Sequence, residues 1–449
     1  MSAWKGVTAP HARGVRFNVA LSATSKLITL VLNLVLVRQY LSYFGGNADV
    51  TGVWLSLVAL LIAVVLFDFG VGNGLRNRLA EQIVHGDWLR GRQVVSSAYA
   101  LLSLMLVPVG VISVAAIMMV DWQSLLSVPH HLVSSHAIRL CAVILLIGLG
   151  LYLILGLVSA VMNAAQLTGL SSVVSTVSNV LLVPLLLVVH LSDTDSALIA
   201  LALMQVGCML VPQLAASVLV YVRWCAALRP SARFVSRREM RHVGGISVQF
   251  LVIQAALVVI NGVNEPLIAT FTRPGDVYTY QAFNRLFTIF SIAFSVLVSP
   301  VWARMAADLV RGEIAGVLRL YGRMARIMWV FLVALALASP AIPLIVGAWY
   351  RVHPPNTGWI VALLGAQTAL LICMYATTSL ANAAGRLRPQ VMTLGGGAVL
   401  KIPISFAVHA ATGSWLAVIA ANTLILAIVV TAQFIANRST LRVAPASSA

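Results

Sequence analysis

Four charged side chains lie inside long apolar runs: Lys26, Glu265, Arg285 and Lys401. A charge in a hydrocarbon environment is costly, so each of these residues should bind a ligand, move an ion or pair with another charge. Three of the four are cations, which indicates an anionic ligand. Glu265 is a candidate for ion coupling, or else it neutralises Arg285 structurally.

Neutral polar residues accompany these charges at helical spacing. In the first apolar run the neutral residues and Lys26 recur every three or four positions and share one helix face: Asn18, Ser22, Lys26, Thr29 and Asn33. Lys26 is ten residues past Arg16 and therefore about 15 Å along the helix axis. An interhelical ion pair is the alternative role for this lysine.

Two further polar faces lie in the second half of the chain. Ser247, Gln254, Asn261 and Glu265 follow at spacings of seven, seven and four, and Pro266 should break or kink that helix. Gln281 and Arg285 share another face. We expect all these faces to line one wet cavity, with the following candidate substrate-binding residues: Lys26, Asn33, Gln254, Asn261, Gln281, Arg285 and Lys401.

Signatures of catalysis and of cofactor binding are weak. The segment Gly70–Gly74 imitates a phosphate loop, but no strand precedes it and no Gly-Lys-Ser/Thr follows. His130 and His131 have no carboxylate or cysteine at metal spacing, and the four cysteines form no CxxC pair. We therefore expect no enzyme activity, no cofactor and no metal. A membrane glycosyltransferase or acyltransferase is an alternative, although such enzymes usually need paired acids or a large external loop.

The elements that position these residues are transmembrane helices. The chain of 449 residues is 60% hydrophobic and only 9% charged, too few charges to cover a soluble domain of this size. The apolar runs predict an all-α polytopic membrane protein of about twelve helices near 14–40, 50–72, 94–120, 136–162, 170–190, 196–222, 243–271, 277–302, 324–347, 357–382, 389–410 and 414–436.

The net charge of +17 is distributed as the positive-inside rule requires. If both termini are cytoplasmic, 22 of the 29 Lys and Arg residues lie in cytoplasmic segments and four in external ones. The segment 223–241 alone contains six arginines. This pattern indicates a multi-pass inner-membrane protein with both termini in the cytoplasm and no nucleic-acid partner.

The sequence also contains an internal repeat. Arg78–Asp87 resembles Arg304–Glu313 at an offset of 226, and Asn163–Ala165 resembles Asn382–Ala384 at an offset of 219. We predict two six-helix bundles, 1–225 and 226–449. Because six is an even number, the two halves share one orientation and are related by a parallel pseudo-twofold axis.

Two stretches resemble a known family. Phe67–Ala80, and Leu380–Gln390 followed by Lys401-Ile-Pro-Ile404 and Gly413, are similar to bacterial polysaccharide-unit flippases. These O-antigen and exopolysaccharide translocases belong to the multidrug/oligosaccharidyl-lipid/polysaccharide exporter superfamily. At the start of the Ile-Pro pattern, where the family often has Asn, this chain has Lys401.

The resemblance implies transport of an undecaprenyl-diphosphate-linked sugar unit from the cytoplasmic to the periplasmic leaflet by alternating access. The implied partners are this lipid-linked oligosaccharide, membrane lipids and a polysaccharide polymerase complex. A multidrug or cation antiporter of the same superfamily is the main alternative, although Lys26 disfavours cationic cargo. A non-transporting scaffold of a polymer-assembly complex is another.

Overall fold

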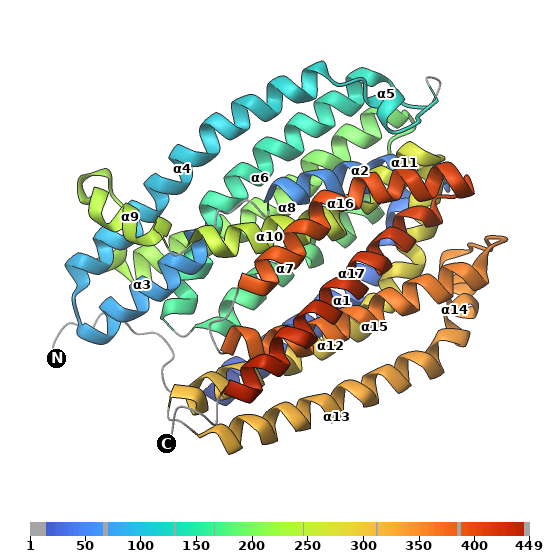
Figure 1. Cartoon of the computed structure of the whole chain (residues 1–449). Coiled ribbons are helices and arrows are strands. Elements are labelled where there is room, and N and C mark those ends of the chain that lie inside the picture. Colours follow the sequence, from blue (N-terminus) through green and yellow to red (C-terminus); the bar gives the residue numbers. More distant parts are fainter. Residues whose placement is uncertain are drawn as a thin grey trace. The chain divides into compact units, whose positions relative to one another are not determined.

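Helices form all the regular secondary structure in the part of the chain that the computed structural model describes, residues 15–65, 71–129, 132–165, 167–245, 247–310, 313–383 and 388–443 (Figure 1). The chain divides into two compact units, Met1–Gln254 and Ala255–Ala449. Eight helices in the described ranges are long and apolar enough to cross a membrane. The predicted fold class, an all-α polytopic membrane protein, is confirmed.

The N-terminal unit consists mainly of long helices joined by short connections. They are α1 (Val15–Tyr43), α2 (Ala48–Val65), α3 (Val71–His85), α4 (Trp88–Met119), α6 (Ser135–Ala164), α7 (Thr168–Val188) and α8 (Thr194–Val218), with a short α5 (Trp122–Leu125) after α4. Three of the long helices begin at a side chain that caps the helix. Asp87, Ser134 and Asp193 accept hydrogen bonds from backbone N–H groups in the first turns of α4, α6 and α8.

The arginine-rich linker follows α8. It contains a π-helical turn (Leu219–Trp224), two 3-10 turns (Ala226–Leu228 and Ala232–Phe234) and α9 (Arg237–Gly245). Because α9 packs on α3 and α4, the linker groups with the N-terminal unit. The two units consequently divide within α10 (Ser247–Gly262), further along the chain than the predicted boundary between 225 and 226.

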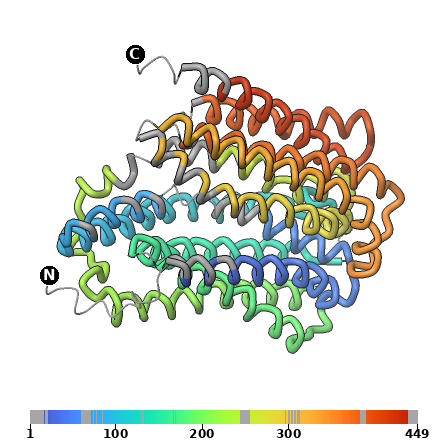
Figure 2. The backbone as a smooth tube through the Cα atoms, turned by 90° about the horizontal axis from the view of Figure 1, so that it is seen from below, coloured from blue at the N-terminus to red at the C-terminus, as the bar shows by residue number. Residues whose placement is uncertain are grey.

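The C-terminal unit has a similar set of helices. They are α11 (Asn264–Phe271), α12 (Pro274–Val310), α13 (Ile314–Ala338), α14 (Ile342–Tyr350), α15 (Thr357–Ala383), α16 (Arg388–Thr412) and α17 (Leu416–Val443), with a 3-10 turn, Ser339–Ala341, between α13 and α14. Figure 2 follows the backbone of each unit through these helices.

The internal repeat is visible in how the helices of each unit pack. In the N-terminal unit α4 packs on α3, α6 on α2, α3 and α4, and α8 on α6 and α7. In the C-terminal unit α13 packs on α12, α15 on α12 and α13, and α17 on α15 and α16. The repeated segments also hold equivalent places, because Asp87 is the N-cap of α4 and Glu313 the N-cap of α13. Both halves therefore use the same order of helix contacts.

The helical pass at 247–271 is interrupted. Helix α10 ends at Gly262, Val263 forms a turn, and α11 begins at Asn264. Pro266 consequently lies in the first turn of α11, where its missing N–H removes no helical hydrogen bond. The predicted break is confirmed, and it places Glu265 at the start of a short helix.

Candidate functional site

The most buried charged group in the described part of the chain is Lys401 on α16. Its side chain is 0% exposed, and its Nζ donates a hydrogen bond of 2.7 Å to the Val418 carbonyl of α17. An ammonium group has three donors and no acceptor, so one carbonyl satisfies only part of its bonding capacity. No carboxylate of the described residues forms a direct ion pair with this ammonium group.

Glu265 and its neighbours form a hydrogen-bonded group between α11 and α12. The Gln281 amide donates to a carboxylate oxygen of Glu265, and the Asn264 amide donates to the Tyr280 hydroxyl over 3.1 Å. All four side chains are buried. The helix break explains the arrangement, since it brings Asn264 and Glu265 to the first turn of α11, where the helix dipole favours a negative charge.

Arg285 and Lys401 belong to the same group, which we call the C-terminal polar cluster: Asn264, Glu265, Tyr280, Gln281, Arg285 and Lys401. Glu265 interacts electrostatically with Arg285 and with Lys401, so two basic side chains accompany one acidic side chain. Neither cation makes a direct ion pair with a carboxylate among the described residues. A cation that does not contact a carboxylate still attracts a mobile anion, because electrostatic interactions are strong in a medium of low dielectric constant.

Several polar atoms of the cluster also have unused bonding capacity. Asn264 Oδ1, Gln281 Oε1 and Arg285 Nε are buried without a hydrogen-bond partner in the described structure. Buried polar groups are usually satisfied, and exceptions commonly mark functional positions. The cluster can therefore accept a ligand that brings both donors and acceptors.

Two members of this cluster were not among the residues predicted from sequence: Asn264 and Tyr280. Each directly precedes a predicted residue, Glu265 and Gln281 respectively, so their proximity in sequence was an available signal.

The polar face of α1 serves helix packing in part. Ser172 of α7 donates to the Ser22 hydroxyl at 3.2 Å, and the Thr29 and Thr176 hydroxyls lie 3.0 Å apart. Lys26 is exposed between these contacts and has no ion-pair partner in the described part of the chain. The alternative of an interhelical ion pair at Lys26 is therefore not supported.

The remaining predicted residues lie on α1 and α10. Asn33 is half-buried on α1, and Asn261 donates to the Leu257 carbonyl of its own helix at 3.1 Å. The side chain of Gln254 lies outside the described residues, as do His130 and His131. The structure thus brings together Glu265, Gln281, Arg285 and Lys401.

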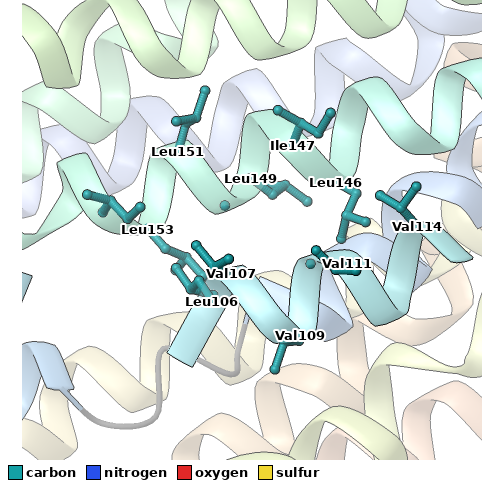
Figure 3. A pocket seen from close by; sticks show the side chains of 13 residues that line it. Leu106, Val107, Val109, Val111, Val114, Leu146, Ile147, Leu149, Leu151 and Leu153 are labelled. Carbon is teal, nitrogen blue, oxygen red and sulfur yellow. The ribbon is translucent and has the colours of Figure 1, made fainter. Parts of the chain in front are cut away.

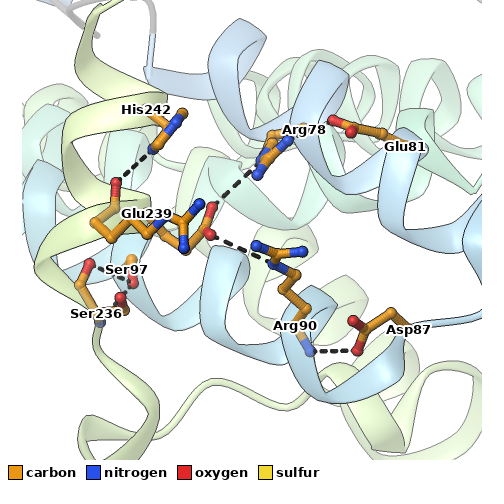
Figure 4. Close-up of polar contacts among 9 residues, drawn as sticks. Arg78, Glu81, Asp87, Arg90, Ser97, Ser236, Glu239 and His242 are labelled. Atoms are coloured by element: carbon orange, nitrogen blue, oxygen red, sulfur yellow. Dashed lines mark hydrogen bonds and ion pairs between the residues drawn. The ribbon is translucent and has the colours of Figure 1, made fainter.

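The linker is fastened to the N-terminal unit by a buried carboxylate (Figure 4). Glu239 of α9 pairs with Arg78 at 3.3 Å and with Arg90 at 3.7 Å, and its side chain is 3% exposed. Ser97 and Ser236 add hydrogen bonds between α4 and the start of α9. The six linker arginines remain exposed, available to the surface of a membrane.

A pocket between α4 and α6 is lined by apolar residues alone (Figure 3). Its volume is about 460 Å³, and Leu106, Val107 and Val111 of α4 face Leu146 and Leu149 of α6. Val107 and Val111 are about two-thirds exposed on this surface. The pocket is suited to hydrocarbon and has no group to recognise a polar head group.

Comparison with known proteins gives matches in structure only. No family model matches the chain, and no curated protein matches its sequence. An inward-facing multidrug resistance MATE family transporter of the MOP superfamily aligns with a TM-score of 0.77 at 12% identity, over 95% of this chain and 100% of that one. An outward-facing structure of such a transporter gives 0.68 at 12% identity, over 95% and 96% of the two chains.

A third similar structure is a MOP superfamily transporter from Pyrococcus furiosus Vc1. It aligns with a TM-score of 0.63 at 12% identity, over 96% of this chain and 95% of that one. This transporter is described as having a binding pocket of reverse polarity that suggests a different function. These alignments extend over nearly the whole of both chains, so this protein has the fold of the MATE transporters of the MOP superfamily.

Proposed function

We propose that this protein is a flippase that moves an undecaprenyl-diphosphate-linked sugar unit from the cytoplasmic to the periplasmic leaflet of the inner membrane. The supporting observation is the C-terminal polar cluster, in which Arg285 and Lys401 outnumber Glu265 and make no direct ion pair with a described carboxylate. A diphosphate is an anion with many acceptor oxygens, and both cations have donors to offer it.

The fold supports a transport mechanism for this cargo. Similar structures are described as inward-facing and as outward-facing, and alternation between two such states would expose the bound head group to each leaflet in turn. Binding by protein cations would offset part of the cost of removing the diphosphate from water. Both termini would be cytoplasmic, and a polysaccharide polymerase would receive the product.

The fold equally accommodates multidrug transport, and Glu265 is the observation that favours this second candidate. A buried carboxylate can attract a cationic drug or bind a coupling cation. The two basic side chains of the cluster oppose that role. The pocket of reverse polarity in the Pyrococcus furiosus protein is consistent with one fold serving different cargo.

Deletion of the gene tests the two candidates directly. Flippase activity predicts that lipid-linked sugar intermediates accumulate in extracted membranes and that surface polysaccharide is lost, with drug susceptibility unchanged. Multidrug export predicts increased sensitivity to cationic drugs and normal polysaccharide. Mass spectrometry of the lipid extract and drug susceptibility measurements separate these outcomes.

A further inference from the structure

The N-terminal unit contains a cavity of its own. It has a volume of about 290 Å³ and is enclosed by residues of α1, α2, α6, α7 and α8. Its polar lining consists of neutral side chains: Thr29, Tyr152, Ser175, Ser178, Asn179 and Gln205. Leucine, valine and methionine side chains complete the wall. The volume is close to the lower end of the range for small-molecule sites, about 300 Å³.

Three of these side chains have hydrogen-bonding groups to spare. Asn179 of α7 and the Tyr152 hydroxyl of α6 form no hydrogen bond within the described structure. Gln205 of α8 accepts a bond of 3.4 Å from Tyr40 on its amide oxygen, which leaves its amide nitrogen for another partner. The spare groups thus come from three different helices and include both donors and acceptors.

The hydroxyls of the cavity retain acceptor capacity. Ser175 donates to the Ser171 carbonyl at 3.3 Å, and Ser178 donates to the Val174 carbonyl at 3.5 Å. Each hydroxyl oxygen still has lone pairs that accept from a ligand. No Asp, Glu, Lys or Arg lines the cavity, so it has no means of compensating a buried ionic charge.

The chemistry of this lining selects a particular ligand class. Amides and hydroxyls that both donate and accept match a ligand with several alcohol groups, and Tyr152 with the aliphatic wall offers apolar surface for C–H groups. We propose that the N-terminal cavity binds a neutral sugar ring. This inference rests on the proposed function for the source of the ring, which would be the sugar of the lipid-linked unit.

Protection of a cysteine in the cavity tests this assignment. The full-length protein with Ser175→Cys, in membrane vesicles, is alkylated by N-ethylmaleimide while two probes are added below their micellar concentrations. The probes are octyl β-D-glucoside and octyl tetraethylene glycol ether. They share the alkyl chain, but only the glucoside has a sugar ring. Ser192→Cys, on an exposed loop after α7, is the matched control for access of the reagent.

We expect the glucoside to slow alkylation of Ser175→Cys, the ether to leave it unchanged, and neither to affect Ser192→Cys. Adding Asn179→Leu should weaken the protection about fivefold, since one hydrogen bond to the ligand is lost. Equal slowing by both probes, or slowing by neither, would overturn the assignment. So would full protection in the Asn179→Leu variant.

This experiment and the gene deletion can fail separately. If deletion leaves lipid-linked intermediates unchanged while the glucoside still protects Ser175→Cys, the cavity binds sugars and the proposed function is wrong. If intermediates accumulate and the glucoside gives no protection, the flippase function stands and the cavity is not its sugar site.

Discussion

Lys401 is bonded to a backbone carbonyl, and this determines what its charge can do. A carboxylate in direct contact would cancel the charge for a ligand, whereas the Val418 carbonyl only orients the ammonium group. Arg285 is similar, because its Nε is buried without a partner in the described structure. Both residues keep charges that an anion can use, and this distinguishes a binding role from a purely structural one.

Replacing Lys401 with methionine should separate these roles. The two side chains have similar length, and Lys401 makes no direct ion pair among the described residues, so the exchange leaves no carboxylate without a contacting partner. We expect Lys401→Met to accumulate in the membrane with an unchanged melting temperature but to lose transport. Surface polysaccharide and membrane protein level are the measurements. Normal polysaccharide in this variant would exclude Lys401 from cargo binding.

Charge is the property that we expect to matter at Arg285. Loss of a charge-assisted hydrogen bond to the diphosphate costs about 1.5–3 kcal/mol, so Arg285→Ala should lower the rate of translocation by about tenfold or more. Arg285→Lys should retain more activity than Arg285→Gln. Arg319→Ala, on an exposed face of α13, serves as the control. Wild-type levels of polysaccharide with Arg285→Ala would refute the cationic-site hypothesis.

At the scale of elements, close approach of two helices depends on single glycines. Gly148 of α6 faces Val206 of α8, and a Cβ added there would lie 2.6 Å from Val206 Cγ1. Membrane helices commonly use small residues in this way, because packing contacts replace the hydrophobic effect between them. Gly150 is two residues away, yet no atom lies within 4 Å of its added Cβ.

This pair gives a controlled test of the helix packing. Gly148→Ala should destabilise the protein by about 1–3 kcal/mol through overpacking. Gly150→Ala should leave stability unchanged or slightly higher, because alanine favours a helix. Thermal unfolding of the purified protein measures both. Equal melting temperatures for the two variants would contradict the α6–α8 contact.

Glu239 should control how the linker is attached. Glu239→Gln removes both ion pairs of α9, and because Arg78 and Arg90 are partly exposed the cost should be about 1–2 kcal/mol. Local opening would then release the linker backbone around its exposed arginines, so trypsin should cleave the linker faster in membrane vesicles.

Glu81→Gln is the matched control for this variant. Glu81 pairs with the same Arg78 at 2.6 Å but is 49% exposed, so its loss should change cleavage little. Equal cleavage of the two variants would show that Glu239 does not hold the linker in place.

For the whole molecule, the proposed direction of transport requires a defined topology. The positive-inside distribution predicts that a cysteine at Ala232, exposed in the linker, reacts with an impermeant thiol reagent only from the cytoplasm. A cysteine at Asn356, exposed before α15, should react only from outside. The four native cysteines are unpaired and at least half-buried, so their background is measured in the parent protein. Reaction of the Ala232 variant in intact cells would reverse the orientation.

The sequence by itself determined the helices and their repetition. Apolar run lengths predicted the passes to within a few residues at most ends, because the thickness of a bilayer fixes the length of a span. The offset of 226 predicted that Asp87 and Glu313 hold equivalent places, and Pro266 predicted a break in its helix. These features are local, so neighbouring residues suffice to specify them.

The tertiary structure decided which neighbour each polar face meets. Spacing placed Ser22 and Thr29 on one face of α1, but it did not indicate that hydroxyls of α7, 150 and 147 residues away, would bond them. The same holds for Glu239, whose partner Arg78 is 161 residues away in sequence, and for the cavity assembled from five helices. Helical periodicity specifies a direction around one axis, whereas a contact also depends on the rotation and position of a second helix.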